Sequence, residues 1–78
     1  MNLIEKEMES LIQEHGTRIF SEKQVAKIIN KSTATLGRWR KKCLYLKYKK
    51  VGSAKNASVE YTARSVAEYI VNNDVQVS

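Results

Sequence analysis

Two predicted helices lie so close together in the sequence that only a sharp turn can join them. The first begins at Ser21 and Gln24, which have the spacing of a capping box. Its apolar residues recur at helical intervals, and they are Val25, Ala26, Ile28 and Ile29. Asn30 tolerates the left-handed geometry that ends a helix, and Ser32 is a suitable cap for the next helix. Two short helices joined by so tight a turn are typical of a helix-turn-helix.

Helical patterns also stand near both ends of the chain. Asn2 and Glu5 repeat the capping spacing and Gly16 is a natural stop, which predicts a first helix of about three turns. This helix has an apolar stripe formed by Ile4, Met8, Leu11 and Ile12. Thr62 is the expected cap of a last helix, whose inward residues are Val66, Tyr69 and Ile70. We expect residues 73–78 to form a frayed tail.

Between these patterns the apolar period changes from helical to alternating. In the helix after Ser32, one face is shared by Leu36, Trp39, the stem of Arg40, and Cys43. From residue 44 the period is two, and residues 52–56 interrupt it; the alternating apolar residues are Leu46, Tyr48, Val59 and Tyr61. This pattern predicts a basic hairpin with a loop longer than the tight two-residue type. The sequence therefore predicts a mainly α fold with a small β-hairpin wing and an extra N-terminal helix.

The charges are strongly segregated along the chain. Between Glu22 and Glu60 there is no acidic residue, yet this stretch holds eleven of the fourteen Lys and Arg residues. The net charge is −3 for residues 1–22, +11 for residues 23–59 and −2 for residues 60–78, which together give +6. A contiguous positive block attracts a polyanion, because counterions released from phosphates supply affinity. The alternatives are a solvated basic face and a Lys-rich targeting tract.

Composition excludes several classes of site. A single cysteine, Cys43, allows no internal disulfide, and with the single histidine, His15, it leaves too few ligands for a Cys/His zinc site. We find no phosphate-binding Gly loop, nucleophile elbow or paired carboxylates, so we expect neither an enzyme nor a cofactor. No apolar run approaches the roughly 20 residues of a membrane span, and the acidic N-terminus does not resemble a signal peptide. We expect a single cytoplasmic domain without membrane contact.

The order helix, turn, helix, basic hairpin, helix resembles the winged helix-turn-helix of the MerR and phage excisionase superfamily. The matching segments are residues 20–29 (FSEKQVAKII), 32–39 (STATLGRW) and 61–70 (YTARSVAEYI). The family often has Gly where this chain has Asn30 and Cys43, and full MerR regulators add a dimerising helix and an effector domain. Short excisionases and AlpA-like phage regulators are nearer in size. The resemblance spans roughly residues 19–72 and implies a winged helix-turn-helix DNA-binding domain over residues 17–72. The N-terminal amphipathic helix predicted over residues 1–16 is not part of the resemblance.

A recognition helix enters the major groove with its outward residues against base edges. If Leu36 and Trp39 face the core, the outward residues are Thr33, Ala34, Gly37, Arg38 and Lys41. Arg38 is expected to grip guanine O6 and N7, or else to bind a phosphate. A glycine inside a helix, such as Gly37, lowers stability by about 1 kcal/mol relative to alanine. Either close approach to DNA or packing against another helix would explain why a glycine stands at this position.

The remaining contacts are expected to be with phosphates. Ser32 caps the recognition helix, whose N-terminus can itself hold a phosphate. The lysines expected to bind phosphates are Lys41, Lys42, Lys47, Lys49 and Lys50, while Lys55 at the wing tip would reach the backbone or minor groove. The alternative for each lysine is simple solvation.

Aromatic residues raise a different possibility, which is stacking on single strands. Trp39, Tyr61 and Tyr69 each fall on the apolar stripe of their own element, so core packing is the preferred interpretation. Cys43 is expected to be a small buried hydrophobe.

Three functional hypotheses follow. The first is a double-stranded DNA-binding protein that regulates transcription or acts in recombination, with RNA polymerase or integrase as protein partner. The second is a protein-interaction module, in which the apolar stripe of residues 1–16 docks a partner helix or forms a homodimer. The third is the DNA-binding part of a phage packaging protein similar to a terminase small subunit.

Overall fold

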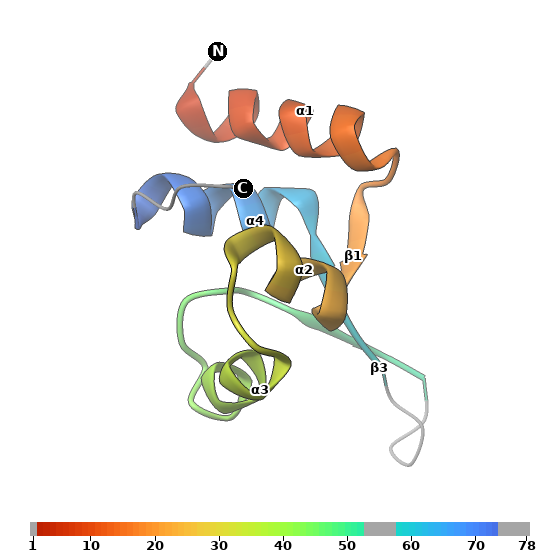
Figure 1. The fold of residues 1–78 in the computed structure, drawn as a ribbon, viewed down its shortest axis with the longest axis vertical. Coiled ribbons are helices and arrows are strands. Elements are labelled where there is room, and N and C mark those ends of the chain that lie inside the picture. The colour runs from red at the N-terminus through yellow and green to blue at the C-terminus, as the bar shows by residue number, and fades with distance from the viewer. Residues whose placement is uncertain (1, 53–57, 74–78) are drawn as a thin grey trace.

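A small antiparallel sheet joins the segment of residues 19–21 to a hairpin of residues 49–51 and 58–62, which lies much further along the sequence (Figure 1). The computed structural model describes residues 2–52 and 58–73. In chain order the elements are α1 (Leu3–His15), β1 (Ile19–Ser21), α2 (Glu22–Ile29), α3 (Thr33–Lys41), β2 (Lys49–Val51), β3 (Ser58–Thr62) and α4 (Ala63–Asn72). The predicted class, mainly helical with a small β wing, is confirmed. Across these ranges, no helix is both long enough and apolar enough to cross a membrane.

Each helix begins at the side-chain cap that the sequence predicted. The Asn2 side chain accepts a hydrogen bond from the Glu5 backbone N–H at 2.8 Å. Ser21 and Gln24 form the complete reciprocal capping box, while Ser32 and Thr62 cap α3 and α4. These bonds satisfy backbone N–H groups that have no partner within the helix.

Two of the helix ends also match the sequence prediction. Gly16 follows α1 with φ 67°, and Asn30 follows α2 with φ 59°. Both residues therefore lie in the left-handed region, where Gly and Asn are the usual choices. The predicted tail is described only at Asn73, which caps the end of α4; residues 74–78 lie outside the described residues.

Strand β1 was not predicted, and it changes the sheet from a hairpin to three strands in the order β1-β3-β2. Phe20 of β1 lies opposite Tyr61 of β3, and both side chains are fully buried. Three residues are too short a run for an alternating pattern to show, so this strand is defined only by its long-range partner.

The prediction of an extended strand from residue 44 onward is wrong for residues 44–48. Cys43 and Tyr45 have φ values of 54° and 64°, which are left-handed and cannot belong to an extended strand. Strand β2 therefore begins only at Lys49. Cys43 is exposed rather than buried, so its predicted role as a core residue is wrong. Leu46 is nevertheless buried.

Helix α1 packs along α4 (Figure 1), and its apolar stripe is used inside the chain. Leu11 is fully buried, while Ile4, Met8 and Ile12 are partly buried against the core. The N-terminal helix thus completes the core of this chain. Of the two alternatives for this stripe, packing within the domain or against a partner or second copy, the structure shows the first, since the stripe is in contact with α4.

Candidate nucleic-acid interface

Helix α3 has one face against the core and one face in solvent. Leu36 is fully buried and Trp39 packs partly buried against the core. Of the residues predicted to point outward, Thr33, Ala34, Arg38 and Lys41 are exposed, whereas Gly37 is half-buried. Lys42, the C-terminal cap of α3, is exposed as well.

Arg38 lies back along its own helix toward the N-terminus. Its Nη2 donates to Thr35 Oγ1 at 3.3 Å, and Thr35 Oγ1 is 2.9 Å from the cap oxygen, Ser32 Oγ. Within the described ranges Arg38 has no acidic partner. Because a guanidinium carries five N–H donors, it keeps enough of them for a base edge or a phosphate.

Arg40, on the opposite side of α3 from Arg38, forms hydrogen bonds with another residue of the protein, Glu22. Its Nε donates to Glu22 Oε2 at 2.8 Å and its Nη2 to Glu22 Oε1 at 3.5 Å. Tyr61 Oη donates to the same Glu22 Oε2 at 3.0 Å. The Arg40 guanidinium carbon also lies 5.9 Å from the centroid of the Tyr48 ring. One carboxylate therefore ties α3 to the start of α2 and to β3.

The protonation behaviour of this network follows from its contacts. The hydrogen bond to Glu22 raises the pKa of Arg40, which remains charged. Burial, and next the hydrogen bond to Glu22, raises the pKa of Tyr61 to about 12.

The sequence predicted that the stem of Arg40 lies on the inner face of its helix, but it did not predict the ion pair between Arg40 and Glu22. The one feature of the sequence that could have suggested this pairing is the position of Glu22 as the last acidic residue before the basic block.

The strand register divides the hairpin lysines between two faces. Cross-strand partners lie on the same face of a sheet, and neighbours along a strand alternate. Lys50 pairs with Val59, which packs against the core and shares its face with Tyr61. We call this the covered face, because Tyr61 contacts Glu22 of α2, which in turn binds Arg40 of α3.

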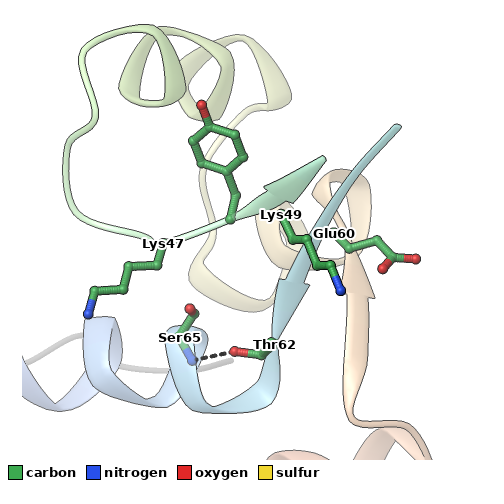
Figure 2. A pocket seen from close by; sticks show the side chains of 6 residues that line it. Lys47, Lys49, Glu60, Thr62 and Ser65 are labelled. Carbon is green, nitrogen blue, oxygen red and sulfur yellow. Dashed lines mark hydrogen bonds between the residues drawn. The ribbon is translucent and has the colours of Figure 1, made fainter. Parts of the chain in front are cut away.

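The opposite face of the hairpin, the open face, holds the other two lysines. Lys49 pairs with Glu60, and Glu60 in turn pairs with Ser21 of β1. A shallow pocket of about 120 Å³ on this face is lined by Lys47, Lys49, Glu60, Thr62 and Ser65, together with Tyr48 (Figure 2). The structure therefore does not bring Lys47 and Lys49 together with Lys50. The predicted tip residue, Lys55, lies outside the described residues.

Gly37 has no packing role within the described residues. A Cβ built there would meet only Arg40 Nη2, at 3.8 Å, which is ordinary van der Waals contact. Within the described residues, no other helix packs closely against Gly37.

Three further lysines belong to the exposed basic surface although they were not assigned a contact. Lys23 and Lys27 are exposed on α2, and Lys31 is exposed in the turn before α3. The signal that could have found them is the rule that the first helix of a helix-turn-helix crosses the DNA backbone.

The preferred interpretation of the aromatic residues is confirmed for Tyr61 and Tyr69, which are buried. Trp39 is partly buried and packs against Tyr45, with ring centroids 4.5 Å apart and ring planes tilted by 56°. In the part of the chain that the structure describes, no group of three or more His, Cys, Asp or Glu residues could hold a metal ion. Comparison with protein-family models, with curated proteins and with solved structures found no match to this chain.

Proposed function

We propose that this chain binds double-stranded DNA as a winged helix-turn-helix, with α3 in the major groove and the hairpin on the adjacent backbone or minor groove. The observation that carries the proposal is the outward face of α3. Ala34, Arg38 and Lys41 are all exposed there. The inner face is fixed by Leu36 and by the pairing of Arg40 with Glu22. A major groove about 12 Å wide admits such a helix.

The charges support the same function. Of the eleven bases in residues 23–59, Lys55 lies outside the described residues and Arg40 pairs with Glu22. The other nine are exposed and form no ion pair with a described residue. Neutralising phosphates with such side chains releases counterions, so affinity should fall steeply as salt rises.

The proposed contact is compatible with transcription regulation, excision or packaging, all in the cytoplasm. In each case the same surface would hold DNA, and what assembles on it differs. The protein-interaction alternative loses its main support, because α4 contacts the apolar stripe of α1.

Selection from a random-sequence duplex pool tests the proposal. We expect the parent protein to enrich a defined site. We expect Arg38→Ala to lose about 1–3 kcal/mol of discrimination at one base pair, because a bidentate contact to guanine is worth that much. The matched control is Arg64→Ala, since Arg64 lies on α4 outside the basic block and pairs with Glu68.

Each other outcome has a defined meaning. Equal weakening of Arg38→Ala on every duplex would make Arg38 a phosphate contact. No binding of the parent to any duplex at low salt would refute the proposed function.

A further inference from the structure

The covered and open faces of the hairpin point in opposite directions, and only the covered face is linked to α3, through Tyr61, Glu22 and Arg40. We propose that DNA approaches only from the α3 side, so that Lys50 contacts a phosphate while Lys47 and Lys49 do not. This inference rests on the proposed function and states which side of the wing faces the ligand.

The direction of each lysine follows from the register. Lys50 lies opposite Val59, on the face that α2 and α3 cover. Because cross-strand partners share a face, the Lys50 side chain leaves the sheet on the same side as Val59, which is the side of α3. Lys50 is exposed there, whereas Val59 is partly buried. Lys49, one residue earlier, must point the other way. Figure 2 shows Lys47 and Lys49 on the side of the sheet away from α3, around the start of α4.

Electrostatics distinguishes the two faces in the same sense. On the open face Lys49 lies directly opposite Glu60, whose negative charge attracts the lysine and repels a phosphate. On the covered face the nearby acid is Glu22, which already accepts bonds from Arg40 and Tyr61. A polyanion therefore meets less opposition on the α3 side.

Salt titrations of duplex binding test this inference with neighbouring residues of the same type. Each phosphate contact contributes about −0.9 to the slope of log affinity against log salt. We expect Lys50→Ala to reduce the steepness by about 0.9, so that its affinity falls about three- to fourfold less than that of the parent between 50 and 200 mM salt. We expect Lys49→Ala and Lys47→Ala to keep the parent slope.

Glu60→Gln provides an independent measurement that removes no lysine. If DNA stays on the α3 side, this substitution leaves affinity close to that of the parent. The inference is overturned if Lys49→Ala flattens the slope as much as Lys50→Ala, or if Glu60→Gln tightens binding severalfold. Failure of the parent to bind any duplex would instead refute the proposed function itself, before the faces could be compared.

Discussion

Among individual residues, Glu22 of α2 is hydrogen-bonded to two other elements, α3 and β3. Its carboxylate accepts hydrogen bonds from Arg40 and from Tyr61, so three elements meet at one side chain. Both charged partners are mostly shielded, with side-chain exposures of 27% for Arg40 and 22% for Glu22. Bonds to a charged, partly buried group are worth more than surface ion pairs. Glu22 thereby fixes how α3 sits on the rest of the molecule.

The phenol of Tyr61 gives this network a pH dependence. Burial and the bond to Glu22 raise the pKa of Tyr61 from 10.0 to about 12. Below pH 10 the phenol is protonated in both the folded and the unfolded chain, so its contribution is complete. Between pH 10 and 12 the unfolded chain loses its proton first, and the free energy of unfolding falls.

We therefore expect Tyr61→Phe to be less stable at pH 8, by about 1.5 kcal/mol, because Glu22 loses a donor. We also expect a smaller loss of stability from pH 10 to 12 than in the parent. Urea unfolding of both proteins at each pH measures the difference, and other titrating groups cancel in the comparison. Parallel pH profiles would show that Tyr61 does not carry this dependence.

Among the elements, the helices and the hairpin strand β3 were predictable, whereas β1 and the start of β2 were not. The helix starts at Asn2, Ser21, Ser32 and Thr62 follow from local capping chemistry, which the sequence displays directly. Strand β1 depends on β3, which lies some forty residues further along, and β2 is displaced by left-handed residues that no local pattern marks. The register, and with it the separation of Lys49 from Lys50, therefore needed the structure.

The same contrast applies to the candidate interface. Helical geometry alone predicted the outward face of α3, because Leu36 and Trp39 identify the inner face. The pairing of Arg40 with Glu22 spans eighteen residues and could not be derived from spacing.

Within α3, a substitution at Gly37 is expected to change the free energy of unfolding and the duplex affinity in opposite directions. A Cβ at this position finds no close neighbour apart from the Arg40 side chain at 3.8 Å. We expect Gly37→Ala to raise the free energy of unfolding by about 1 kcal/mol, because Gly is unfavourable inside a helix. We expect the same substitution to weaken duplex binding, since DNA would approach the bare backbone there.

Ser10→Ala is the control, because Ser10 is exposed on α1 and the change favours helix formation without altering α3. Thermal unfolding and a duplex titration of both variants give the comparison. Unchanged affinity in Gly37→Ala would place the DNA away from this residue, and lower stability would reveal a structural role for the glycine.

In the molecule as a whole, acidic side chains lie mainly at one end and basic side chains at the other. Figure 1 shows α1 and α3 at opposite ends, with α4 and α2 between them. Helix α1 carries the acids Glu5, Glu7, Glu9 and Glu14, whereas α3 carries only basic charges. Such an asymmetric field orients the molecule as it approaches a polyanion. The basic end would meet DNA first.

Charge reversal at the two ends tests most directly whether α3 holds the duplex. Lys41→Glu on α3 and Lys6→Glu on α1 both lower the net charge from +6 to +4, and both lysines are exposed. The measurement is duplex affinity at fixed salt, with thermal unfolding to confirm that each variant folds. We predict that Lys41→Glu loses at least tenfold in affinity, or about 1.4 kcal/mol, while Lys6→Glu stays near the parent. Equal losses in the two variants would contradict binding through α3 and leave only a general attraction by net charge.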